Sequence, residues 1–187
     1  CHAMSACATS GFSTKNASVA YFDSPLIETV LILTMGIAGM HFGLIYATVT
    51  GKRNNLFRSE VTRWYVGILL GCSVLIAVSL YAADIYPTLT SSFRHAAFQF
   101  FSLMTTTGFA SADSNVWPPF AVILLMFGSI VCACAGSTTG GMKVNRLVLA
   151  GKMIRTQLQR QQHPNAVIRI KLDGMLQELS LIHISEP

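Results

Sequence analysis

An uncharged stretch from Val116 to Met142 constrains this chain most, because it contains no Asp, Glu, Lys or Arg. A helix that crosses a bilayer needs about 20 predominantly apolar residues, so the stretch is long enough to span. Its final part, from Ala135 to Gly141, is nevertheless rich in glycine, serine and threonine. Non-helical backbone is tolerated at membrane depth only where it lines a cavity or is buried in protein. We therefore predict a spanning helix that is broken at this loop.

Composition also indicates a membrane protein. Of the 187 residues, 52% are hydrophobic and only 11% are charged, whereas a soluble domain has about 25% charged residues. The formal net charge of +5 comes mainly from two basic runs, Lys52–Arg63 and Lys143–Lys171. Such clustering is typical of cytoplasmic loops and does not indicate a nucleic-acid-binding surface.

Two further uncharged runs, Thr29–Thr50 and Trp64–Ala83, are long enough to be spanning helices. The apolar part of Phe93–Ala110 covers only about 12 to 15 residues and is too short. Both basic runs are expected in the cytoplasm, so one more full span between them would place the second run outside. The sequence thus predicts that Phe93–Asn115 enters the membrane and returns to the same outer face, as a re-entrant segment.

The chain also contains an internal repeat with an offset of 97 residues. The matched pairs are Ser5 and Ser102, Thr9 and Thr106, Gly11 and Gly108, Phe12 and Phe109, and Gly39 and Gly136. In both copies a short apolar segment precedes Thr-x-Gly-Phe, and a polar loop and an uncharged run follow. Repeats are a common plan of membrane transporters. We therefore predict an all-α membrane protein whose repeated unit is a short re-entrant helix, a turn and a spanning helix that together form part of a pore.

A Thr-x-Gly-Phe turn in mid-membrane can bind cations through its backbone. Carbonyl oxygens that face a common axis can replace the hydration shell of an ion, and Gly11 and Gly108 allow a left-handed backbone that aligns them. No ring of Asp or Glu accompanies the turns, which favours a monovalent ion over Ca²⁺ or Mg²⁺. A single such turn is more often an ordinary turn, and it is the repeat that favours the ion-binding interpretation.

Several segments together match a known family. They are Ser5-Ala6 through Gly11-Phe12-Ser13-Thr14, Tyr21–Pro25, Ile37–Phe42, Thr105–Phe109, Ala135–Val144 and His163–Val167. In these residues the chain resembles the Trk/Ktr/HKT superfamily of potassium transporters, and most of all its bacterial TrkH-type subunits. The resemblance covers nearly all of residues 1–175. It implies an all-α membrane protein with four repeated helix–pore helix–helix units resembling a K⁺ channel, with a broken helix in the third. Residues 1–50 are then the back part of the second repeat and residues 64–160 are the third, while 51–63 form a cytoplasmic loop and 161–179 a cytoplasmic connector.

The resemblance implies roles for two sets of residues. The selectivity filter, the carbonyl-lined constriction that chooses the ion, would contain Thr9, Ser10, Gly11, Phe12, Thr106, Thr107, Gly108 and Phe109. The gating loop below the filter would consist of Ala135, Gly136, Ser137, Thr138, Thr139, Gly140 and Gly141. Potassium is then the transported ion, no cofactor is expected, and the only metal bound is potassium at the filter. Two of the four filters lie outside the chain under this scheme, so potassium selection by the whole pore is inferred from the family.

The family also implies a location and partners. It predicts a multi-pass protein of the bacterial cytoplasmic (inner) membrane that forms a homodimer and binds a cytosolic nucleotide-binding RCK/KTN regulatory subunit, which is TrkA-like. The basic segments Lys52–Arg58 and Lys143–Arg160 could be docking surfaces for that subunit. They are equally well explained as topology signals and lipid contacts.

One other interpretation stays open at this point, and a second is rejected. A Na⁺-coupled secondary transporter could hold its substrate at a helix broken at Ala135–Gly141, although this leaves the repeated Thr-x-Gly-Phe unexplained. A nucleotide-binding enzyme is disfavoured, because Met142 separates Gly141 from Lys143 and the Gly-Lys-Ser/Thr ending of a phosphate loop is absent. No catalytic residue is predicted. The chain is also expected to be an internal fragment, with residues 180–187 a non-native tail.

Overall fold

The computed structural model of this protein describes residues 1–51, 59–162, 171–172 and 175–176. In chain order the elements are α1 (His2–Cys7), η1 (Ser18–Phe22), α2 (Pro25–Ala38), α3 (Phe42–Val49), α4 (Glu60–Ala82), α5 (Leu89–Met104), η3 (Ser114–Val116), α6 (Pro119–Ile130), β1 (Val131–Cys132), β2 (Met142–Lys143), α7 (Val144–Gln162), β3 (Lys171–Leu172) and β4 (Met175–Leu176). The predicted non-native tail, 180–187, and most of the predicted connector, 161–179, lie outside the described residues.

Helix α4 is long and apolar enough to cross a membrane, and no other single helix in the described ranges is. The Ser59 hydroxyl caps its N-terminus by accepting a hydrogen bond from the Thr62 backbone N–H at 3.5 Å. Helices α2 and α3 together would make a second span, but they are bent by 96° relative to each other. Helix α6 is apolar and shorter.

The continuous helix predicted over Thr29–Thr50 is wrong, because α2 ends at Ala38 and α3 begins at Phe42. The break is stabilised by contacts that a straight helix would not make. The Tyr65 hydroxyl donates to the Gly36 carbonyl at 3.1 Å, and the Gly39 carbonyl accepts from the backbone N–H of Cys134 at 3.1 Å. Tertiary hydrogen bonds therefore replace the helical ones that are lost at the bend.

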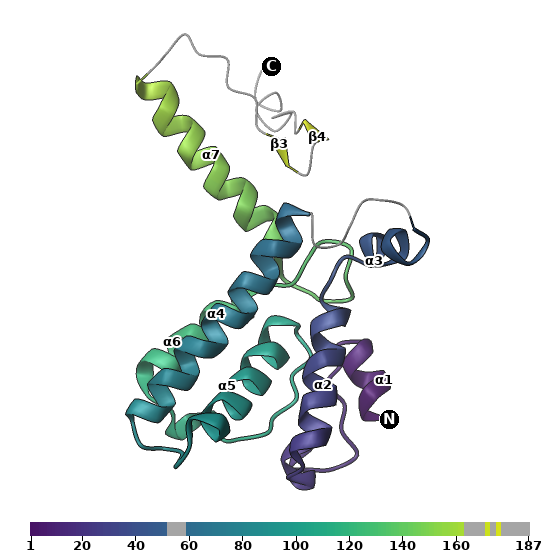
Figure 1. Ribbon diagram of the computed structural model, residues 1–187, viewed down its shortest axis with the longest axis vertical. Helices are drawn as coiled ribbons and strands as arrows, with labels where there is room; N and C mark the ends of the chain where they lie inside the picture. The colour runs from purple at the N-terminus through teal and green to yellow at the C-terminus, as the bar shows by residue number, and fades with distance from the viewer. Residues whose placement is uncertain (52–58, 163–170, 173–174, 177–187) are drawn as a thin grey trace, which may run out of the picture.

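Helix α5 lies at the centre of the fold, between α2 on one side and α4 and α6 on the other (Figure 1). The larger hydrophobic cluster fills the space among α4, α5 and α6, and includes Tyr65, Ile76, Phe100 and Leu125. The smaller cluster joins α1, α2 and α5. Its buried members are Ala6, Val19, Leu31, Met35, Phe98 and Phe109. One short helix is thus held by packing on both sides.

The uncharged run 116–142 is helical only between Pro119 and Ile130. Proline at the start of α6 fits the first helical turn, where a missing N–H costs nothing. Beyond α6 the chain forms β1, a loop and β2, and the two strands pair in parallel with Val131 opposite Met142. Helix α7 begins directly afterwards and extends away from the helical body (Figure 1). The loop between β1 and β2 includes Ala135–Gly141.

Candidate ion-binding site

The first Thr-x-Gly-Phe turn follows α1 directly. Thr9 and Gly11 both have left-handed backbone conformations, with φ of 51° and 69°. The backbone N–H of Ser10 donates to the Ser5 carbonyl at 3.0 Å, and the N–H of Thr9 donates to the Ala6 carbonyl at 3.3 Å. Two residues with positive φ in a span of three reverse the chain at the end of the helix, and glycine tolerates this conformation without a steric penalty.

The second turn repeats this geometry at the end of α5. Thr106 and Gly108 have φ of 55° and 80°. The N–H of Thr107 donates to the Ser102 carbonyl at 2.9 Å, and the N–H of Thr106 donates to the Leu103 carbonyl at 3.0 Å. Each of these donors and acceptors lies 97 positions after its counterpart in the first turn. Two segments far apart in the sequence thus share one unusual backbone arrangement.

The two turns are close neighbours in space. A Cβ atom built on Gly11 would overlap the Thr107 carbonyl group. Beyond the turns the outgoing chains also pair, since the Ala20 N–H donates to the Ala110 carbonyl at 3.1 Å and the Ala110 N–H donates to the Ser18 hydroxyl at 3.3 Å. The structure therefore brings the two predicted filter segments together.

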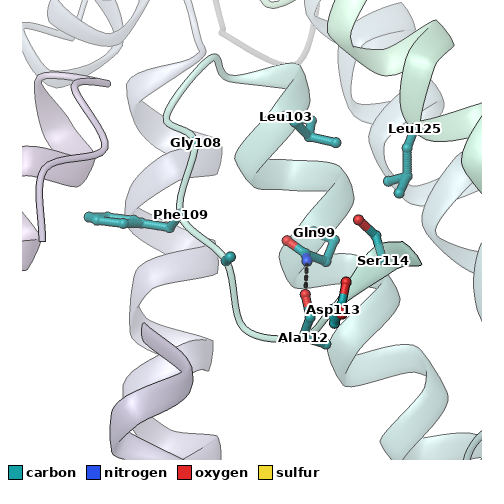
Figure 2. Close-up of a pocket in the computed structure, with 9 residues that line it drawn as sticks. Gln99, Leu103, Gly108, Phe109, Ala112, Asp113, Ser114 and Leu125 are labelled. Atoms are coloured by element: carbon teal, nitrogen blue, oxygen red, sulfur yellow. Dashed lines mark hydrogen bonds between the residues drawn. The ribbon is translucent and has the colours of Figure 1, made fainter. Parts of the chain in front are cut away.

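The phenylalanines of the two turns differ in their surroundings. Phe109 is buried, with 2% of its surface exposed, whereas Phe12 is 81% exposed. Phe109 packs with the cluster shared by α1, α2 and α5, and Figure 2 shows its ring directed away from Gln99. The match in sequence thus corresponds to a match in backbone, while the side-chain environments are unequal within the described residues.

Hydrogen bonds from α5 support the second turn. The Ser102 hydroxyl donates to the Phe109 carbonyl at 2.7 Å, and the hydroxyls of Thr105 and Thr107 are 2.9 Å apart. The Gln99 amide donates to the Ala112 carbonyl at 2.6 Å (Figure 2). Behind the turn lies a pocket of about 340 Å³ between α5 and α6. These contacts hold the second turn and the chain that follows it against α5.

The glycine-rich loop touches both turns. The Thr9 hydroxyl donates to the Thr138 carbonyl at 3.2 Å, and the Thr138 hydroxyl donates to the Cys7 carbonyl at 3.3 Å. On the other side the Gly140 N–H donates to the Thr106 hydroxyl at 3.1 Å. The structure therefore places the predicted gating loop against both predicted filter segments.

A lysine ammonium group binds the same loop, which the sequence did not predict. Lys143 Nζ donates to the carbonyl of Thr139 and to its hydroxyl at 2.9 Å. That hydroxyl lies 2.7 Å from the hydroxyl of Ser137. In the sequence Lys143 is simply the first member of a basic run, so nothing there distinguishes it from a topology signal.

His41 also contacts the loop. It caps α3 by accepting a hydrogen bond from the Gly43 N–H on Nδ1 at 3.0 Å. A Cβ atom built on Gly136 would lie only 2.9 Å from Nε2 of the same ring. The Phe42 N–H donates to the Gly136 carbonyl at 3.2 Å. The bend between α2 and α3 thus packs on the loop, and the repeat had already aligned Gly39 with Gly136.

The oxygens that converge here are backbone carbonyls and hydroxyls. Among the described residues, no group of three or more His, Cys, Asp or Glu side chains could hold a metal ion. Neutral oxygen dipoles suit a monovalent cation better than a divalent one.

Comparison with known proteins points to a family of cation transport proteins. The profile of the TrkH family, described as cation transport protein, matches residues 1–183. The Trk system potassium uptake protein TrkH of Salmonella typhimurium is 38% identical over 172 residues, covering 91% of this chain and 36% of that protein. TrkH of Escherichia coli strain K12 is 36% identical with the same coverage.

A solved structure agrees with these matches. The crystal structure of the potassium transporter TrkH from Vibrio parahaemolyticus superposes with a TM-score of 0.84 at 34% identity, covering 91% of this chain and 37% of that one. The chain therefore spans about a third of the length of the relatives it matches. Given a family profile that matches almost end to end and this agreement in structure, the chain belongs to the TrkH family of cation transport proteins.

Proposed function

We propose that this chain forms two adjacent walls of a carbonyl-lined filter through which a full-length membrane transporter takes up potassium. The observation that supports this most is the shared backbone of the two turns, with φ of 51° and 69° in one and 55° and 80° in the other. A left-handed backbone in both turns would present oxygens from two directions to one axis. The residues assigned to this filter are Thr9–Phe12 and Thr106–Phe109.

Electrostatics favours a cation at this position. Helix α5 ends at Met104, immediately before the second turn, and the C-terminal end of a helix carries a partial negative charge. No Asp, Glu, Lys or Arg is present in either turn. The two turns themselves would therefore offer an ion fixed dipoles and no charged side chain, an arrangement suited to a monovalent ion that must also leave.

Ala135–Gly141 would act as the gate of this filter. Its hydrogen bonds to Cys7, Thr9 and Thr106 place it against both turns, and the Lys143 ammonium adds a positive charge that repels a passing cation. Opening would require the loop to move away from both turns. The paired strands β1 and β2 join the two ends of the loop, and Gly136 and Gly141 have φ of 78° and 69°, a left-handed conformation that glycine enters and leaves without a steric penalty.

The arrangement of the parent protein is proposed from the family. Residues 1–50 would belong to one pore repeat and 64–160 to the next, in a multi-pass protein of the bacterial cytoplasmic membrane. A homodimer with a cytosolic nucleotide-binding, TrkA-like subunit is the proposed assembly. Relatives named as potassium uptake proteins support a transporter, not an enzyme, and support potassium as the cargo.

Transport by the full-length parent in proteoliposomes tests the proposal. We expect uptake of radioactive rubidium that excess K⁺ suppresses and excess Na⁺ does not. Equal suppression by both ions would contradict a potassium filter. Uptake of an organic substrate that depends on Na⁺, without rubidium flux, would instead support a Na⁺-coupled secondary transporter built around the two helix breaks.

A further inference from the structure

A buried carboxylate on α2 is paired with an arginine on α5. Arg94 Nε donates to Glu28 Oε2 at 2.6 Å, and Arg94 Nη2 donates to Glu28 Oε1 at 2.9 Å. The Glu28 side chain is only 2% exposed and that of Arg94 is 24% exposed. The same Nη2 also reaches Asp23 Oδ1 at 3.2 Å, but that carboxylate is 90% exposed. The guanidinium therefore makes one buried, bidentate contact and one exposed contact.

Stability alone is a poor explanation for such a pair. Burying two charges carries a large desolvation penalty, and well-packed apolar residues of similar volume often stabilise a fold as well or better. A bidentate arginine–carboxylate pair has a defined geometry, which an apolar contact between smooth side chains lacks. The geometric property of the Glu28–Arg94 pair is that it fixes the lateral and axial position of α5 against α2.

The position of α5 determines where the second turn lies. Arg94 is ten residues before Met104, the last residue of α5, and at 1.5 Å per residue the helix transmits the position of the guanidinium over about 15 Å. Helix α2 is similarly tied to the first turn, because Ala6 of α1 packs with Leu31 and Met35 of α2. The ion pair therefore connects the supports of the two turns at one end, and the turns meet at the other.

We propose that Glu28 and Arg94 are positioning residues for ion selection, which set the separation of the two filter turns. The proposal rests on the filter function proposed above. At the closest approach Gly11 has no room for even a Cβ beside the Thr107 carbonyl, so a small displacement of α5 changes the spacing of the filter oxygens directly. That spacing, with the number of oxygens, decides between K⁺ and the smaller Na⁺.

The test measures the ratio of rubidium to sodium uptake per folded full-length transporter in proteoliposomes. Glu28→Gln removes the negative charge and leaves a single carbonyl oxygen as acceptor, so the bidentate pair is lost, and we expect the ratio to fall about tenfold, which corresponds to about 1.4 kcal/mol. Arg94→Lys keeps the charge but loses the fork, and should lower the ratio too. The reversed pair Glu28→Arg with Arg94→Glu should recover at least part of it.

Asp23→Asn is the matched control, because it removes the exposed contact of the same guanidinium; its ratio should stay within about twofold of the unmodified value, as expected for an exposed pair. If the unmodified transporter carries no rubidium, the filter function itself fails. If it does, and Glu28→Gln and Arg94→Lys change the amount of folded protein but leave the ratio unchanged, the positioning role is overturned. Loss of all folded protein in the reversed pair while the single variants keep a normal ratio would overturn it equally.

Discussion

Gly11 lies so close to the carbonyl group of Thr107 that no side chain can be placed between them. Gly108, its counterpart in the repeat, has a similar φ, but a Cβ there would meet no atom of the described residues within 4 Å. The repeat is therefore regular in backbone and irregular in packing, and the two glycines are constrained for different reasons.

This difference predicts unequal effects of alanine at the two glycines in the full-length transporter. Gly108→Ala introduces backbone strain of about 1–2 kcal/mol, and should lower the rubidium-to-sodium uptake ratio while leaving measurable rubidium uptake. Gly11→Ala adds a collision with a backbone carbonyl and should abolish rubidium uptake. Both are measured by tracer flux in proteoliposomes at matched protein amounts. Equal loss in the two variants would contradict the packing argument.

The loop contacts predict a leak when they are removed. Thr138→Val keeps the shape of the side chain but loses the hydroxyl that donates to the Cys7 carbonyl, so attachment of the loop to the first turn, which we propose closes the gate, is weakened by roughly 1 kcal/mol. Basal rubidium flux should rise a few fold, and deletion of 137–139 should raise it further. Thr34→Val is the control, because among the described residues that hydroxyl bonds only within its own helix, to the Val30 carbonyl at 2.8 Å. If deletion of 137–139 leaves basal rubidium flux unchanged, the loop has a structural role only.

The Lys143 ammonium predicts a separate effect. Lys143→Met removes both contacts to Thr139 together with a positive charge near the proposed path of the ion. We expect basal rubidium flux to rise and to depend less on salt concentration, since a charge that repels the ion is screened by salt. Lys15→Met removes an equal charge that lies over the Tyr21 ring, 4.3 Å from its centroid, and should leave flux unchanged. A rise in both variants would point to a general charge effect.

Sequence reasoning located the two turns because their chemistry is local. A left-handed backbone at the end of a short helix favours glycine. Gly11 and Gly108 each occur within a Thr-x-Gly-Phe segment of the sequence. The loop Ala135–Gly141 was also found from composition, since Gly, Ser and Thr in an uncharged run oppose a helix. These features depend on residues within a few positions of one another.

The bend between α2 and α3 could not be predicted in the same way. The run Thr29–Thr50 is uncharged and apolar throughout, and length alone favours one span. What ends α2 is tertiary, including the Gly36 carbonyl bonded by Tyr65 and the Gly39 carbonyl bonded by Cys134. The Glu28–Arg94 pair was missed for the same reason, because its partners are 66 residues apart.

The bend between α2 and α3 also predicts how substitution of Gly39 changes the stability of the protein. A Cβ on Gly39 would collide with the Tyr65 hydroxyl and lie 3.0 Å from the Ala133 Cβ, so Gly39→Ala should destabilise the full-length protein by about 1–3 kcal/mol and lower its midpoint of thermal unfolding in detergent. Gly67→Ala, in the interior of α4, meets nothing within 4 Å among the described residues and should stabilise by about 0.5–1 kcal/mol.

A double variant separates this collision from a general effect of alanine. Tyr65→Phe removes the hydroxyl, which is the nearest obstacle, and the hydrogen bond to the Gly36 carbonyl. If the collision is the cause, Gly39→Ala should cost less free energy in the Tyr65→Phe background than in the unmodified protein, because residues in contact are not additive. Equal costs in both backgrounds would mean that the Tyr65 hydroxyl is not what opposes a Cβ at Gly39. A reduced cost would identify contact between α2 and α4 as the reason that an apolar run long enough to span is divided into two helices.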